Sequence, residues 1–188
     1  MLVFSSLFKP RRQCSACVFW DVVDCPIPEG HNVREASGNI IKARESSGYN
    51  GAVSIRAYYG DMNQTMVDVK EPVKELSCVP AGEDKDLRLE MLLVDFLCWI
   101  ISHPAPATYM LIVGDISEHK EFIKAFVRFE KQGYTCLLAQ PQISSVMKSY
   151  GKTNWLWKSL SSGGSPLDED QSESSQLVDS TSVGSGSS

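Results

Sequence analysis

The stretch Tyr109-Met-Leu-Ile-Val-Gly-Asp115 decides the fold. Its first five residues are apolar without alternation, which is typical of a strand buried on both faces of a sheet, and Gly-Asp is a common end for such a strand. Cys17-Val-Phe-Trp-Asp21 has the same form, and Cys136–Leu138 is a third apolar run. Strands of this kind indicate a parallel sheet that is covered by helices on both sides.

Segments with helical character separate the expected strands. We expect helices over 33–47, 65–74, 84–102 and 117–132, and strands over 17–21, 52–59, 75–79, 109–113, 135–139 and 155–157. Asp84 is a good N-cap for the long helix, and His103-Pro104 is a natural stop. Alternating strands and helices imply right-handed crossovers. We therefore predict an α/β fold, a three-layer sandwich with a mostly parallel central sheet.

The 188 residues fit one domain with a substantial core. We expect a loose N-terminal leader over 1–14, the domain over 15–160, and a disordered Ser/Gly/acidic tail over 161–188. No Lys or Arg follows Lys158, so five acids in that tail account for the net charge of −5. No apolar run approaches the roughly 18–20 residues of a membrane span, and the N-terminus lacks the order of a secretory signal.

Six cysteines are scattered through the chain, mostly within apolar segments. In a protein that is not secreted, they are best explained as reduced, small core residues. Cys14-Ser-Ala-Cys17 has the spacing of metal ligands, but no second Cys-x-x-Cys pair accompanies it. The sequence therefore disfavours a structural zinc site.

Three aspartates stand where strands are expected to end. Asp21 and Asp24 follow the first strand, and Asp115 follows the strand at 109–113. In parallel sheets, ligands bind beyond the carboxyl ends of the strands. Neighbouring carboxylates favour a bound cation, and Mg²⁺ or Mn²⁺ is the natural candidate for oxygen ligands.

Each of these acids also has a simpler explanation. Asp24 suits an Asx-turn ahead of Pro26, and Gly-Asp at 115 suits an ordinary turn. Asp95 is the one charged residue between Glu90 and His103, so it is either a metal ligand, a hydrogen-bonded buried acid or an exposed residue of the outer helix face. Several of these acids are expected to converge at the carboxyl ends of the strands, and this convergence favours a metal site.

Several short stretches together resemble the NYN domain family, which has a PIN-like nuclease fold, and in particular its plant-type limkain-b1 or meiosis-regulator-and-mRNA-stability-factor group. The opening motif is Val18-Phe-Trp-Asp-Val-Val-Asp-Cys-Pro-Ile-Pro28. The further matches, in order along residues 17–160, are Gly51–Tyr58, Val79–Gly82, Leu93–Asp95, Pro104–Ala107, Leu111–Asp115, Leu137–Pro141 and Trp155–Trp157.

The resemblance implies RNA cleavage assisted by Mg²⁺ or Mn²⁺. Carried over by position, its acids are Asp21, Asp24, Asp95 and Asp115, of which Asp21, Asp95 and Asp115 would hold metal. The family motif Gly-Asp-x-Asp-Phe is altered here, because Ser117 occupies the place of its second Asp. Glu118 or Glu121 is the candidate substitute, and we include Glu121 among the expected catalytic residues.

The leading hypothesis is a metal-dependent RNA endonuclease, or a version of one weakened by the altered motif, that acts in RNA turnover and the regulation of gene expression. The alternative is a catalytically inactive RNA- or protein-binding NYN module. A response-regulator-like domain also carries strand-end aspartates, but it lacks support from the motifs.

The expected partner is single-stranded RNA, with a protein partner or a second copy as further candidates. Trp20 would either stack on a base or lie in the core, and His119 would point outward from a helix. The expected location is the cytoplasm, while the family resemblance alone also suggests the peroxisome. The candidate RNA contacts are Arg56, Lys85, Arg88, Lys120 and Lys124.

Overall fold

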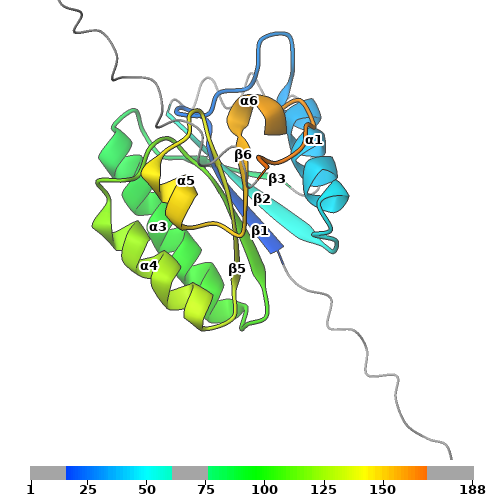
Figure 1. Cartoon of the computed structure of the whole chain (residues 1–188). Coiled ribbons are helices and arrows are strands. Elements are labelled where there is room, and N and C mark those ends of the chain that lie inside the picture. Colours follow the sequence, from blue (N-terminus) through cyan, green and yellow to red (C-terminus); the bar gives the residue numbers. More distant parts are fainter. Residues whose placement is uncertain (1–15, 61–75, 169–188) are drawn as a thin grey trace, which may run out of the picture.

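The computed structural model describes residues 16–60 and 76–168 (Figure 1). In chain order the elements are β1 (Ala16–Asp21), α1 (Val33–Ser46), β2 (Val53–Tyr59), β3 (Leu76–Pro80), α3 (Lys85–Ser102), β4 (Thr108–Ile112), α4 (Lys120–Lys131), β5 (Thr135–Gln140), α5 (Ser145–Ser149), β6 (Thr153–Leu156) and α6 (Trp157–Leu160). The helix expected over 65–74 lies outside the described residues.

The six strands form one sheet in the order β3-β2-β1-β4-β5-β6, and every neighbouring pair is parallel. The predicted α/β class is therefore confirmed. The chain builds outward from β1 to β3 and then crosses back to place β4 on the other side of β1. The boundary between β1 and β4 is thus the switch point of the sheet, where ligands bind in folds of this kind.

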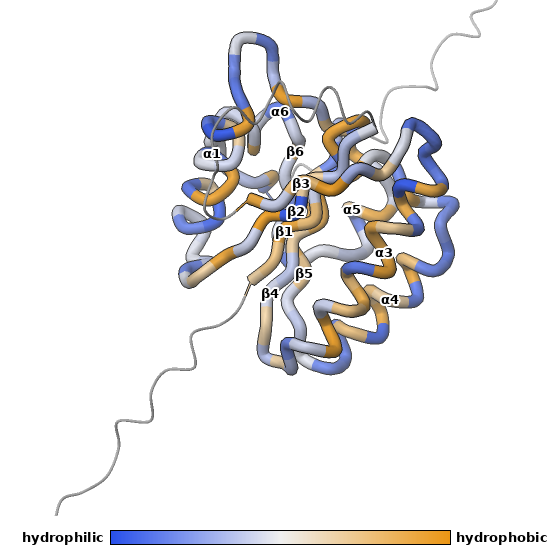
Figure 2. Tube along the Cα trace, turned by 180° about the vertical axis from the view of Figure 1, so that it is seen from behind, coloured by the Kyte–Doolittle hydropathy of each residue, from blue (hydrophilic) through white to orange (hydrophobic). Residues whose placement is uncertain are grey.

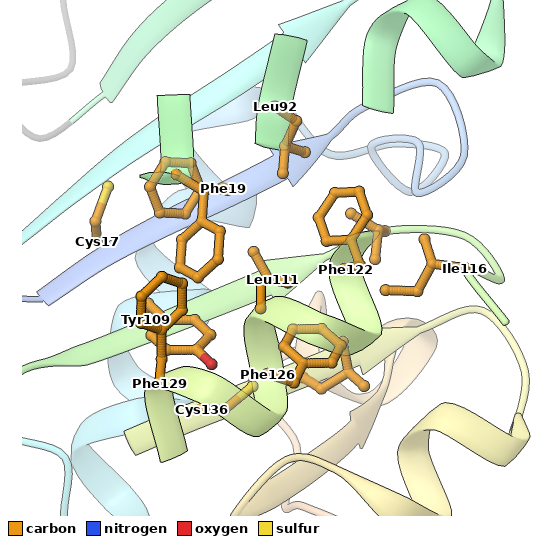
Figure 3. Packing of buried hydrophobic residues seen from close by; sticks show 14 of the residues in the cluster. Cys17, Phe19, Leu92, Tyr109, Leu111, Ile116, Phe122, Phe126, Phe129 and Cys136 are labelled. Carbon is orange, nitrogen blue, oxygen red and sulfur yellow. The ribbon is translucent and has the colours of Figure 1, made fainter. Parts of the chain in front are cut away.

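Helices cover both faces of the sheet, with α3, α4 and α5 on one side and α1 and α6 on the other (Figure 1). Side chains of β1 alternate between the layers, as a pleated strand requires. Phe19 packs among residues of α3 and α4, whereas Trp20 packs toward α1 and α6. Figure 3 shows the first of these cores, to which Phe19, Leu92, Leu111 and Phe122 contribute.

Helix α3 is anchored at both ends as expected. The Asp84 carboxylate accepts a hydrogen bond from the Leu87 amide at 3.0 Å, which makes Asp84 the N-cap. The helix ends at Ser102, before Pro104. Leu89, Leu92 and Phe96 recur at helical spacing on its buried face. Its outer face is also rich in apolar residues (Figure 2), and Ile101 is 83% exposed.

The structure differs from the predicted elements at two places near the C-terminus. Trp157 begins α6 instead of continuing the last strand, and both Trp155 and Trp157 are buried. The packed chain also continues past residue 160, where the disordered tail was expected to begin. Ser161 is fully buried, and the Leu167 amide donates to the Asn154 carbonyl at 2.8 Å. Residues 161–168 therefore belong to the folded domain.

Within the described ranges, the structure also bears on the cysteines and on the possibility of a membrane-spanning helix. Cys17, Cys25, Cys98 and Cys136 are free thiols, in agreement with the expectation of reduced cysteines, whereas Cys14 lies outside these ranges. Within the same residues, no helix has both the length and the apolar character needed to cross a bilayer.

Candidate functional site

The predicted strand-end acids converge at the switch point. Asp21 is the last residue of β1, Asp24 lies in the turn that follows, and Asp115 lies just beyond β4. Gly114 brings the two segments together, because a Cβ atom at this position would collide with the Asp24 carboxylate. A larger residue here would therefore displace the Asp24 side chain, which the Gly-Asp signal alone does not reveal.

Asp21 is a buried carboxylate, with 1% of the side chain exposed. Its Oδ1 accepts hydrogen bonds from the backbone amides of Val23 at 3.0 Å and Asp24 at 3.3 Å, which fix the turn after β1. Burial raises the pKa of Asp21, because desolvation disfavours the charged form, and the hydrogen bond from Arg88 acts in the opposite direction.

Arg88, in the first turn of α3, holds the two carboxylates of the β1 turn. Its Nε lies 3.0 Å from Asp21 Oδ1 and 3.1 Å from Asp21 Oδ2, and its Nη2 lies 3.1 Å from Asp24 Oδ1. The remaining nitrogen, Nη1, donates to the carbonyl of Glu83 at 2.8 Å. Since only 1% of its side chain is exposed, Arg88 does not offer the RNA contact considered from the sequence.

The sequence analysis missed Arg88 as a residue of the acidic site, although a signal was present. Arg88 lies four residues before Leu92 and eight before Phe96, on the stripe that faces the sheet. A cation on an apolar helix face needs a buried anion as its partner. The strand-end aspartates were the available candidates.

A second cation, Lys85, lies at the rim of the same site. Its Nζ lies 3.2 Å from Asp24 Oδ2 and 3.3 Å from the backbone carbonyl oxygen of Asp115. The Lys85 side chain is 44% exposed and that of Asp24 is 18% exposed, so this ion pair is partly solvated. Lys85 thus connects the turn after β1 with the turn after β4.

Asp115 accepts hydrogen bonds from Ser117, which stands where the motif of the resemblance has its second Asp. Its Oδ1 accepts hydrogen bonds from the Ser117 amide at 2.9 Å and the Ser117 hydroxyl at 2.6 Å. These bonds hold the pKa of Asp115 below its ordinary value. The Ser117 hydroxyl also lies 3.1 Å from that of Ser145, which joins this turn to α5.

Asp95 and Glu121 have other partners. Asp95 Oδ2 accepts a hydrogen bond from the Tyr58 hydroxyl at 2.8 Å and lies 3.4 Å from Nη1 of Arg56. Asp95 is two helical turns, about 10 Å, beyond Arg88 along α3. Glu121 pairs with Lys124 at 2.8 Å on the exposed face of α4. The structure therefore groups Asp21, Asp24 and Asp115, but neither of these two acids, at the switch point.

The nearby aromatic and histidine side chains do not extend the site. Trp20 is fully buried, its Nε1 donates to the Cys25 carbonyl at 2.8 Å, and its ring packs on Trp157. Of the two positions considered from the sequence, Trp20 therefore lies in the core and does not stack on a base. His119 precedes α4 with its Nε2 3.9 Å from Asp86, and 27% of its side chain is exposed.

The arrangement at the switch point does not fit a divalent cation. Both oxygens of Asp21 are bound by Arg88, and the two oxygens of Asp24 face Arg88 and Lys85. The two carboxylates are thus already balanced by two protein cations. Within residues 16–60 and 76–168 there is also no group of three or more His, Cys, Asp or Glu side chains suited to holding a metal ion.

Comparison with known proteins assigns the family. A family model described as the NYN domain matches residues 15–152, which is more than half of the chain. No curated protein is similar enough to count as a relative. The parallel sheet and its switch-point aspartates are consistent with this match. The chain therefore belongs to the NYN domain family, a PIN-like nuclease family.

Proposed function

We propose that the protein is an RNA-binding NYN module that holds single-stranded RNA at the carboxyl edge of its sheet without cleaving it. The observation that carries this proposal is the contact of Arg88 with Asp21 and Asp24. In a nuclease that uses metal ions, those carboxylates must be available to a cation. Here the protein's own guanidinium binds them.

Exposed cations at the same edge support contact with a phosphate backbone. Lys85 begins α3 and Lys120 begins α4, and both helices follow strands whose carboxyl ends form this edge. Both residues are exposed. Lysine ammonium groups bind phosphate oxygens as point charges, and such contacts supply much of the affinity for nucleic acid.

A metal-dependent RNA endonuclease that acts in RNA turnover is the second candidate. It is favoured by the convergence of Asp21, Asp24 and Asp115, since divalent metals in nucleases are held by carboxylates. It requires Arg88 and Lys85 to release those carboxylates when Mg²⁺ or Mn²⁺ binds. The ion pair of Glu121 with Lys124 gives this candidate no additional acid at the site.

The proposal is tested by fluorescence anisotropy of a labelled single-stranded RNA in EDTA, over a range of salt concentrations. The wild type is compared with Lys85→Ala/Lys120→Ala. The matched control is Arg128→Ala/Lys131→Ala, which removes the same charge from the last turn of α4, about 12–16 Å along that helix from Lys120.

Loss of two phosphate contacts should reduce the slope of log affinity against log salt by about 1.4. The control should leave the slope close to that of the wild type. The proposal is wrong if the wild type does not bind RNA, or if both double variants weaken binding equally.

A further inference from the structure

Helix α3 is apolar on the side that faces away from the sheet as well as on the side that packs against it (Figure 2). Its exposed apolar residues are Leu87, Met91, Val94, Leu97, Cys98 and Ile101. Among them, Leu87 is 57% exposed, Val94 59% and Ile101 83%. A helix that is apolar on all sides is normally covered on all sides. The outward side of α3 is therefore a surface that a binding partner should cover.

Five of these residues have the spacing of a seam between two paired helices. They follow one another at intervals of four, three, four and three residues, and we call them the outer stripe of α3: Leu87, Met91, Val94, Cys98 and Ile101. A repeat of 3.5 residues keeps side chains in one line along a helix, and it is the pattern by which two helices pack side by side. The outer stripe therefore indicates that the missing cover is another helix.

We propose that the outer stripe binds the outer stripe of a second copy of this chain, with the two α3 helices antiparallel. The stripe is centred on Val94, because Leu87 lies seven residues before it and Ile101 seven residues after it. In an antiparallel pair with its two-fold axis at Val94, Leu87 of one copy meets Ile101 of the other. The same five residues thus supply both halves of the contact, whereas a different protein would have to bring a matching seam of its own.

The charges beside the stripe favour the antiparallel direction. Asp86 and Glu90 are exposed near its N-terminal half, whereas residues 97–102 carry no charge. A parallel pair would place each acid beside the same acid of the second copy, and like charges that face each other across an interface are unfavourable. In the antiparallel pair, each acidic half lies beside an uncharged half. The two Asp86 residues are then about 24 Å apart, because each lies eight residues from the axis.

The extent of the stripe fits a weak dimer. Apolar patches that exceed a few hundred Å² on the surface of a monomer mark interaction sites. Pairing of two stripes would bury on the order of 1,000 Å² in total, which is at the lower end of specific interfaces. We therefore expect the dimer to form at micromolar concentrations and above, and to dissociate on dilution.

The test is sedimentation velocity of the full chain without RNA, from low micromolar to several hundred micromolar protein. The wild type is compared with Val94→Asp and with the control Ile143→Asp, which adds the same charge at a residue that is 39% exposed in the turn before α5. Circular dichroism checks that all three are folded. Val94→Asp should raise the dissociation constant of the dimer at least about tenfold, because two like charges meet at the axis. The control should leave it unchanged.

Cysteine cross-linking tests the direction of pairing. In a Cys98→Ser background, Val94→Cys should form a disulfide-linked dimer on mild oxidation, because the two copies of this residue meet at the axis. Ser102→Cys in the same background should not, because its two copies would lie about 24 Å apart. The Cys98→Ser protein by itself is the control for the remaining cysteines.

A wild type that stays monomeric over the whole concentration series would overturn the inference. So would a folded Val94→Asp that dimerises as readily as the wild type, or an equal loss of dimer in Ile143→Asp. Cross-linking of Ser102→Cys as readily as Val94→Cys would overturn the antiparallel pairing. Because no RNA is present, these outcomes are independent of the RNA-binding proposal.

Discussion

At the scale of single residues, Arg88 decides the chemistry of the site. Three of the four acids that the NYN resemblance highlights, Asp21, Asp24 and Asp115, lie at the strand ends, but a buried guanidinium from α3 contacts two of them. Removing one member of a buried ion pair leaves the other as an uncompensated charge, so such pairs are strongly coupled in stability.

Arg88→Met should lower the free energy of unfolding by about 3–5 kcal/mol, because Asp21 stays buried without its partner. Asp21→Asn should also destabilise the protein. The double variant Arg88→Met/Asp21→Asn should lose less stability than the two single losses added together. Urea denaturation of the four proteins measures this coupling, and strictly additive losses would show that the pair is not energetically linked.

The same variants should differ in their dependence on pH. Burial raises the pKa of Asp21 in the folded protein, so the folded state binds its proton more tightly than the unfolded state does. The stability that this proton provides is present below the ordinary carboxyl pKa of about 4 and is lost as pH rises through the folded value.

Arg88→Met removes the group that opposes this shift, so the free energy of unfolding should fall more steeply than in the wild type as the pH rises through the raised pKa of Asp21. Asp115 has a lowered pKa and acts in the opposite direction, but equally in both proteins. Adding Asp21→Asn should abolish the extra pH dependence. If the extra pH dependence persisted in Arg88→Met/Asp21→Asn, it would come from a group other than Asp21.

At the scale of elements, α3 has two roles. Its first turn supplies Lys85 and Arg88 to the site, and its later turns supply Leu92, Phe96 and Trp99 to the core beneath. Packing of the later turns thus positions the first turn over the switch point. Its outer face, which carries Val94 and Ile101, is not part of that packing.

Two apolar residues of α3 should therefore respond very differently to truncation. Phe96 is fully buried and contacts the rings of Phe19, Tyr109 and Phe129, so Phe96→Ala should cost about 3–5 kcal/mol. Ile101 is 83% exposed, and Ile101→Ala should change stability by less than about 0.5 kcal/mol. Thermal or urea unfolding distinguishes them, and similar losses would contradict the described packing of α3.

At the scale of the whole molecule, the sequence predicted the architecture better than the site. Apolar strands such as 109–113 indicate a covered parallel sheet through their composition alone, and Asp84 marks the start of α3 by a local capping rule. Both signals lie within a few neighbouring residues. Both signals can therefore be recognised in the sequence without knowledge of tertiary contacts.

The site depends on contacts that are distant in the sequence. Arg88 meets Asp21 across 67 residues, and Asp95 meets Tyr58 across 37 residues. The sequence left open whether Asp95 holds a metal, is a hydrogen-bonded buried acid or is exposed on the outer helix face. It did not show that the partner comes from β2. Burial on a helix face reveals that a partner is needed, whereas only the fold reveals which one.

The C-terminal boundary was missed for a similar reason. The Ser/Gly composition after residue 160 indicates a loop, but Leu167 packs against the core and the Asn39 side chain donates to the Ser161 carbonyl at 2.8 Å. A chain ending at Leu160 should therefore be roughly 2 kcal/mol less stable than one ending at Asp168. Urea unfolding of the two truncated chains tests this, and equal midpoints would place the boundary at 160.

The central claim is that this NYN domain binds RNA while its own cations occupy the carboxylates. The most direct measurement incubates the wild type with end-labelled single-stranded RNA in EDTA and in MnCl₂, and follows binding by anisotropy and RNA length on a denaturing gel. The account predicts that the protein binds the RNA and leaves it intact under both conditions. Cleavage that requires Mn²⁺ and disappears in Asp115→Asn would contradict it and establish the metal-dependent nuclease instead.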